Sequence, residues 1–259
     1  MEPLQHQWKG RTALITGATA GIGRQVCEQL IGYGIPVVGI GRRKEKLDEL
    51  ASSLREINGR AAEDLFLGIS TDIRSEQAIK QAMKQINEWN GNKGVDILVN
   101  SAGVGYSAKL IDGDTESWRE MWETNVLALS ILTREVIQDM KRRNVDDGII
   151  IHLSSMAAHR PIALSFYSAT KAAVKMLGDC LRQELREAHS NIRVAMVSPG
   201  HVETEFYVHV GGEEFANNLY RSMKCLEPKD IADSIVYILS CPSLVDIHDI
   251  WMRPRDMKF

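Results

Sequence analysis

Tyr167 and Lys171 are the pair of side chains in this sequence whose types and spacing most directly suggest chemistry. They are four residues apart and lead into an apolar run of helical periodicity, so we expect them one turn apart on the same helix face. A lysine ammonium beside a phenol favours the phenolate, and it would lower the tyrosine pKa from its usual value of about 10. A tyrosine tuned in this way can exchange a proton with a substrate oxygen. Such pairs also occur on ordinary helices, so the function depends on what the rest of the chain places beside them.

A glycine-rich turn near the N-terminus has the pattern of a phosphate-binding loop. Gly17, Gly21 and Gly23 lie between an apolar run at Thr12–Thr16, which suits a buried strand, and a helical pattern that continues to about Tyr33. Glycines at this junction let the backbone approach a phosphate, and the first N–H groups of the following helix can bind it. Glycines also serve ordinary tight turns. The position of this turn, opening a strand–helix–strand unit, favours a nucleotide site.

The end of the second predicted strand carries two adjacent arginines. The strand, at Pro36–Ile40, is followed by Gly41, Arg42 and Arg43. In a dinucleotide-binding fold, an acidic residue at this place binds the 2′-hydroxyl of the adenosine ribose. Here Gly41 occupies that place, and guanidinium groups pair well with a phosphate. We therefore expect NADP(H) rather than NAD(H). The alternative is that the two arginines simply begin the next helix in solvent.

Strands alternate with helices along the whole chain, and no proline- or serine-rich linker divides it. The fold class we predict is α/β, with a single Rossmann-type doubly wound domain spanning residues 1–259 and a mostly parallel sheet. In such sheets ligands bind outside the carboxyl ends of the strands. Polar or glycine-rich positions follow six predicted strands in this sequence, at Gly17, Gly41–Arg42, Asp72, Asn100, Ser155 and Pro199. The irregular pattern at about 201–224 suits a substrate lid over that edge.

Composition excludes several classes of function. The net charge of −3 gives no field for binding nucleic acid. No apolar run approaches the roughly 18 residues of a membrane span, and the N-terminus lacks the pattern of a secretory signal, so we expect a cytoplasmic protein. Four widely spaced cysteines and the scattered histidines show no metal-ligand spacing, and we expect no metal. His152 lies inside a predicted strand and is expected to be a packed histidine rather than a base.

The motifs together resemble those of the classical short-chain dehydrogenase/reductases, over essentially the whole chain. The matching segments are Thr16–Gly23, Asp72, Asn100–Gly103, Asn125, Ser155, Tyr167–Lys171 and Pro199–Gly200. Further stretches are similar to one subgroup, which contains the insect NADP-dependent farnesol dehydrogenases and a related vertebrate reductase of steroid ketones. Those stretches are Asn144–Gly148, Leu181–Glu187, Met223–Leu226 and Asp249–Pro254.

The resemblance implies roles for four catalytic residues. Tyr167 would be the general acid/base, and Lys171 would lower its pKa and hold the nicotinamide ribose. Ser155 would hydrogen-bond the substrate oxygen, and Asn125 would hold a water on the proton path to Lys171. The spacing of twelve residues between Ser155 and Tyr167 is slightly short for the family. Ser154 is therefore the alternative to Ser155, which we prefer because Met156-Ala157-Ala158 follows it as in relatives.

The resemblance also implies an NADP(H) site, a substrate class and an assembly. The expected cofactor contacts are Gly17, Thr19, Gly21, Ile22, Gly23, Arg42, Arg43, Asp72, Ile73, Asn100, Ala102, Gly103, Tyr167, Lys171, Pro199, Gly200, Val202 and Thr204. The expected substrate is a small apolar alcohol or carbonyl compound, either a farnesol-like isoprenoid alcohol or a steroid ketone. A homodimer or homotetramer is implied. The alternatives are a reductase of sugar or fatty-acyl carbonyls, and a non-catalytic NADP-binding sensor or scaffold.

Overall fold

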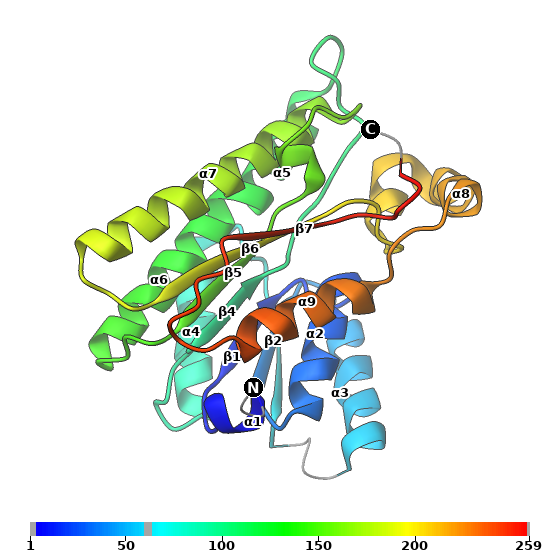
Figure 1. Cartoon of the computed structure of the whole chain (residues 1–259). Coiled ribbons are helices and arrows are strands. Elements are labelled where there is room, and N and C mark those ends of the chain that lie inside the picture. Colours follow the sequence, from blue (N-terminus) through cyan, green and yellow to red (C-terminus); the bar gives the residue numbers. More distant parts are fainter. Residues whose placement is uncertain (1–3, 60–63, 258–259) are drawn as a thin grey trace.

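A seven-stranded parallel sheet forms the centre of the computed structural model, which describes residues 4–59 and 64–257 (Figure 1). The strand order is β3-β2-β1-β4-β5-β6-β7, and each neighbouring pair is parallel. The strands are β1 (Ala13–Thr16), β2 (Val37–Gly41), β3 (Phe66–Ser70), β4 (Ile97–Asn100), β5 (Ile149–Leu153), β6 (Arg193–Pro199) and β7 (Asp249–Met252). This confirms the predicted single α/β domain. The order reverses between β1 and β4, where such sheets bind their ligands.

Helices cover both faces of the sheet (Figure 1). The main helices are α1 (Leu4–Gln7), α2 (Gly21–Gly32), α3 (Lys44–Asn58), α4 (Glu76–Trp89), α5 (Thr115–Trp122), α6 (Leu129–Arg142), α7 (Ser165–Glu187), α8 (Phe206–Ser222) and α9 (Pro228–Ser240). Two short helical segments of other types are also present, the π-helix η2 (Glu123–Ala128) and the 3₁₀-helix η3 (Met156–Ala158). No helix in the described part of the chain is long and apolar enough to span a membrane.

Alternating strand residues divide the core into two layers. In β1, Ala13 and Ile15 pack with α2, α3 and α9, whereas Leu14 packs on the opposite face with α4 and α6. Successive side chains of a strand point to opposite faces, so a sheet covered on both faces needs strands that are apolar at nearly every position. This is why β1, β4 and β5 are buried along their full lengths.

The segment before Asn125 differs from the sequence-based prediction. The sequence pattern predicts a continuous helix from about Glu116 to Arg143, with Thr115 as a possible cap. The structure instead interrupts the helix with η2, and Asp114 is the N-cap, with a side chain that accepts a hydrogen bond from the Ser117 amide. A π-helical turn inserts an extra residue, which rotates the side chains that follow relative to those before it. Apolar periodicity cannot detect a single inserted residue.

The predicted lid is more regular than its sequence pattern. Most of it forms α8, which is kinked at Gly212, where the backbone has φ 85° and ψ 173°. A positive φ is strained for residues with a side chain, so glycine permits this kink. The segment lies beside the carboxyl edge of the sheet (Figure 1).

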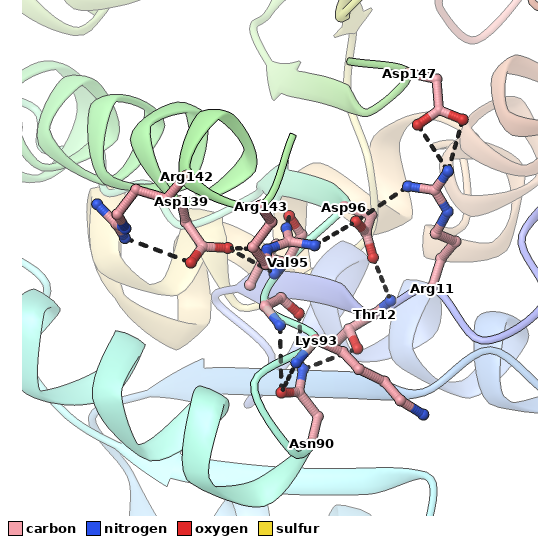
Figure 2. A network of polar contacts seen from close by, with 11 residues as sticks. Arg11, Thr12, Asn90, Lys93, Val95, Asp96, Asp139, Arg142, Arg143 and Asp147 are labelled. Carbon is pink, nitrogen blue, oxygen red and sulfur yellow. Dashed lines mark hydrogen bonds and ion pairs between the residues drawn. The ribbon is translucent and has the colours of Figure 1, made fainter. Parts of the chain in front are cut away.

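A buried ionic network closes the opposite, amino-terminal edge of the sheet (Figure 2). Arg143 Nη1 lies 3.0 Å from Asp96 Oδ1, and Arg143 Nε lies 2.9 Å from Asp139 Oδ2. Its third donor reaches the Val95 carbonyl at 2.7 Å. Arg11 binds the same Asp96 oxygen at 3.2 Å. Because both carboxylates are nearly fully buried, they depend on these guanidinium groups for compensation.

We expect Arg143→Ala to lower the free energy of unfolding by about 3 kcal/mol, since it leaves two buried carboxylates under-compensated. Arg142→Ala is the matched control, because Arg142 contacts the same Asp139 at 3.4 Å but its side chain is 62% exposed. That variant should lose less than about 1 kcal/mol. Urea denaturation followed by circular dichroism measures both. Equal losses in the two variants would show that burial does not control the contribution of this network.

Candidate active site

A cavity of about 1090 Å³ opens at the carboxyl edge of the sheet. The glycine turn after β1 and the arginines after β2 line one end, and residues before α7 and in α8 line the other. The sequence analysis predicts sixteen cofactor contacts besides Tyr167 and Lys171. Fifteen of these residues line the cavity, and the exception is Asn100. The parallel topology therefore gathers residues that lie between Gly17 and Met257 in the sequence into one site.

Tyr167, Lys171 and Ser155 meet on the floor of the cavity. Tyr167 and Lys171 lie one turn apart on α7, as predicted, and the lysine Nζ is 5.8 Å from the centre of the tyrosine ring. The ammonium donates a hydrogen bond of 2.7 Å to the Leu153 carbonyl at the end of β5. This bond ties the start of α7 to β5, the strand that ends two residues before Ser155.

The pKa of Tyr167 does not follow the sequence-based expectation. Burial raises it to about 12, and a hydrogen bond with Ser155 lowers it only in part. Burial also lowers the pKa of Lys171 to about 8. The expectation considered the attraction between the two groups and neglected the cost of burying charge, which here is the larger effect for both. Ser155 is thus the residue that favours the phenolate in this arrangement.

The structure distinguishes Ser154 from Ser155. The Ser155 hydroxyl caps η3 by accepting a hydrogen bond of 3.1 Å from the Ala157 amide, and it faces Tyr167. The Ser154 hydroxyl turns toward the backbone of α7, 3.4 Å from the Lys171 carbonyl. The turn at 156–158 therefore orients the preferred serine toward the tyrosine.

Two asparagines predicted for the site lie behind its wall. Asn125 forms two hydrogen bonds with the Val104 backbone, at 2.8 and 2.9 Å, and a third with Thr170 Oγ1 at 3.1 Å. Asn100 binds Thr133 Oγ1 and His152 Nδ1, each at 3.1 Å. Each amide is buried and joins a cavity-lining segment to a helix or strand behind it. Their side chains position the wall and do not line the cavity.

His152 is a packed, neutral histidine, as the sequence analysis expected. Burial, together with smaller contributions from the nearby Arg182 and Lys171, lowers its pKa to about 3. At neutral pH it carries no charge, which suits its hydrogen bond with Asn100.

The glycine turn is too tightly packed for other residues. A Cβ atom at Gly23 would lie 2.4 Å from the Gly17 carbonyl oxygen, and one at Gly17 would lie 3.0 Å from the Ala102 amide nitrogen. The N-cap of α2 is Ala20, whose side chain caps no N–H group. The first N–H groups of α2 are therefore available to an anion in the cavity, as the phosphate-binding prediction requires.

The arginine end of the cavity suits a second anionic group. A Cβ atom at Gly41 would lie 2.4 Å from Thr19 Cγ2, so an acidic side chain does not fit where NAD-binding folds place one. Arg42 and Arg43 both line the cavity. Arg43 contacts Thr19 Oγ1 at 3.0 Å and Glu205 at 2.8 Å, and so joins the glycine turn to the start of α8. These residues fit a dinucleotide with a phosphate on the adenosine ribose.

The other end of the cavity is mainly apolar and aromatic. Phe206 lies 5.1 Å from the Tyr167 ring and 5.2 Å from the Tyr207 ring, measured between centroids. Other side chains complete this end: Met156, Pro161, Ile162, Leu164, Val210, Phe215 and Leu219. Apolar walls beside a Tyr–Ser pair suit an oxygen-bearing substrate with a large hydrophobic body.

Sequence reasoning missed several residues of the site. Met257 lines the cavity near Gly200, brought there by the chain after β7. His201 also lines it and is hydrogen-bonded to the Tyr207 hydroxyl. Thr124 of η2 is a further cavity-lining residue. Met257 could not be predicted from its position at the end of a strand, because Met257 lies five residues after the end of β7.

Comparisons with known proteins show the family to which this chain belongs. The family model described as short chain dehydrogenase matches residues 11–213. The chain is 43% identical to human dehydrogenase/reductase SDR family member 11, with 98% of each chain covered. It is 34% identical to the farnesol dehydrogenase of Aedes aegypti, with 98% of this chain and 99% of that one covered.

A solved structure extends the similarity to three dimensions. The closed form of a serine dehydrogenase complexed with NADP⁺ superposes with a TM-score of 0.86, at 31% identity and with 96% of each chain covered. From the family match, the relatives and the shared fold, it follows that this chain belongs to the classical short-chain dehydrogenase/reductase family of oxidoreductases.

Proposed function

We propose that this chain is an NADP(H)-dependent alcohol dehydrogenase and carbonyl reductase that acts on apolar substrates. The observation that carries the proposal is the meeting of Ser155, Tyr167 and Lys171 on the floor of one cavity. The glycine turn and Arg42 line one end of that cavity, and aromatic side chains line the other. This arrangement joins a proton donor to both a nucleotide site and an apolar pocket.

Tyr167 is proposed to exchange the proton with the substrate oxygen. With a pKa of about 12 it is protonated at neutral pH, the form that donates to a carbonyl oxygen. Ser155 donates a second hydrogen bond to that oxygen and stabilises the charge that develops there. Lys171, with a pKa of about 8, remains mainly protonated at pH 7 and holds the nicotinamide ribose. NADP(H), when bound, supplies or accepts the hydride.

Asn125 is proposed to act by holding the backbone at Val104 in place. The sequence-based hypothesis is that Asn125 binds a water molecule on the proton path to Lys171. A Cβ atom at Gly103 would lie 3.4 Å from Asn125 Oδ1 and 3.5 Å from Lys171 Nζ, so the two groups approach the same backbone position. That proximity supports a path between them, and the hydrogen bonds to Val104 keep the amide fixed.

The cofactor preference rests on the arginine end of the site. Arg42 and Arg43 are proposed to bind the 2′-phosphate, with Asp72 and Ile73 beside the adenine. The NADP⁺ complex of the related serine dehydrogenase supports this choice. The remaining predicted contacts stay assigned to the cofactor, with Asn100 as a residue that supports the wall.

The substrate is proposed to be a farnesol-like isoprenoid alcohol or a steroid ketone. The aromatic and aliphatic lining beside Tyr167 favours both over a sugar, whose hydroxyl groups would need polar partners. The name of the Aedes relative supports the isoprenoid choice.

A substrate panel tests the proposed function. NADP⁺-linked oxidation of farnesol, geraniol and hydroxysteroids, and NADPH-linked reduction of the matching carbonyls, should give turnover with at least one apolar class. Glucose and short acyl carbonyls are the comparison substrates. NADPH binding without oxidation across the whole panel would favour the sensor or scaffold alternative, whereas preferred turnover of sugars would contradict the apolar pocket.

We also propose a cytoplasmic homodimer or homotetramer. Exposed apolar side chains at Trp122, Leu127 and Met176 occur on α5, η2 and α7, which carry or adjoin the catalytic residues. An interface between copies over these helices would bury them.

A further inference from the structure

Glu120 of α5 contacts both arginines nearest the proposed ribose-phosphate site. Its Oε1 atom lies 3.3 Å from Arg42 Nη1 and 3.6 Å from Arg74 Nη1. Its Oε2 atom accepts a hydrogen bond of 2.8 Å from the Tyr106 hydroxyl. One carboxylate thus lies between two guanidinium groups that come from the ends of β2 and β3.

The partners of Glu120 are held to different degrees. Arg74 is fixed by Asp72, with contacts of 3.0 and 2.6 Å to one carboxylate oxygen. Burial, together with the bond to Glu120, raises the pKa of Tyr106 to about 12, so Tyr106 keeps the proton that it donates. Arg42 is the least constrained of the group, because its side chain is 52% exposed.

The charges of this cluster cancel. Arg42 and Arg74 contribute two positive charges, and Asp72 and Glu120 contribute two negative ones. A phosphate entering beside Arg42 therefore meets a guanidinium that already has an anionic partner. The Asp72 carboxylate also lies close enough to Arg42 for the arginine to lower its pKa, after the larger effect of the Arg74 hydrogen bonds.

We infer that Glu120 is a specificity-determining residue that limits the affinity of the site for a ribose 2′-phosphate by pairing with Arg42. The inference rests on the proposed NADP(H) function. Glu120 acts on the cofactor through Arg42, since Glu120 and Arg74 are not among the residues that line the cavity. The residue thereby narrows the difference in affinity between the two nicotinamide cofactors.

The geometry of the Arg42–Glu120 contact indicates that Glu120 competes with a phosphate for Arg42, rather than orienting Arg42 toward the phosphate. The Arg42–Glu120 contact is a single, long hydrogen bond at a half-exposed guanidinium, which holds Arg42 weakly. A phosphate monoester carries between one and a half and about two charges at pH 7 and offers three acceptor oxygens. It pairs with both arms of a guanidinium and so displaces the carboxylate, at the cost of breaking that ion pair.

Glu120→Gln tests the inference, because glutamine keeps an acceptor for Tyr106 and removes the negative charge. The ligands are adenosine 2′,5′-bisphosphate and adenosine 5′-monophosphate, which differ only in the 2′-phosphate, and calorimetry measures their binding. We expect the bisphosphate to bind about fivefold more tightly to the variant than to the wild type, with the monophosphate unchanged. Glu116→Gln is the control, since Glu116 is an exposed glutamate on the same helix that pairs with Arg119.

Unchanged or weaker bisphosphate binding in Glu120→Gln would overturn the inference, and weaker binding would show that Glu120 orients Arg42. Equal tightening in Glu116→Gln would also overturn it, by showing that only the overall charge of α5 matters. Failure of the proposed cofactor preference appears separately, in the wild type, as equal affinity for the two nucleotides. A circular dichroism spectrum of each variant checks that the fold is retained.

Discussion

Replacing Tyr167 with phenylalanine is expected to lower kcat by about a thousandfold in both directions of the reaction, since general acid–base groups contribute on the order of 10² to 10⁴. The change removes one hydroxyl group and leaves the ring that packs against Phe206. The fold and the nucleotide end of the cavity should therefore be unaffected. NADPH binding, followed by its fluorescence, is expected to stay within about tenfold of the wild type, because the loss of one neutral hydrogen bond costs about 0.5–1.5 kcal/mol.

A second tyrosine provides the control for this variant. Tyr237 lies on α9 and is half-exposed, so Tyr237→Phe should retain the wild-type kcat. A Tyr167→Phe enzyme with more than about a tenth of the wild-type kcat would contradict the assignment, since its loss would then fall below the range for such groups. Lost NADPH binding in Tyr167→Phe would instead point to a structural role for the hydroxyl.

Replacing Arg42 with alanine is expected to raise KM for NADPH by about 30-fold, in the range for a lost hydrogen-bonded charge pair. KM for NADH should change by less than about threefold, since NADH has no 2′-phosphate to lose a partner. Arg42 is half-exposed and its contact with Glu120 is long, so the protein should fold normally without it. Steady-state kinetics with each cofactor, at fixed saturating substrate, measures the two ratios.

The control for Arg42→Ala is Arg119→Ala, which removes the same charge from an exposed position on α5. It should change KM for both cofactors equally and slightly. An equal rise for NADPH and NADH in Arg42→Ala would mean that Arg42 supports the general shape of the site. That result would favour the alternative in which the arginines after β2 only begin α3.

Much of the fold follows from local patterns in the sequence. Short apolar runs predict six strands. Serine is favoured at helix N-caps, so Ser75 indicates the start of α4, and its side chain accepts a hydrogen bond from the Ala78 amide there. In a parallel sheet, the carboxyl ends of all strands lie at the same edge. For this reason, residues such as Gly17, Arg42 and Ser155 could be assigned to one site although they are far apart in the chain.

The sequence by itself determined which residue types reach the carboxyl edge of the sheet, because strand periodicity and parallel connections fix that edge. Only the tertiary structure decided how they act there. It turned Ser155 toward Tyr167 and Ser154 away, and burial rather than Lys171 set the direction of the tyrosine pKa. It also placed Glu120 against Arg42, 78 positions earlier in the chain. Desolvation and side-chain direction are sums over segments that are distant in sequence, so no local pattern contains them.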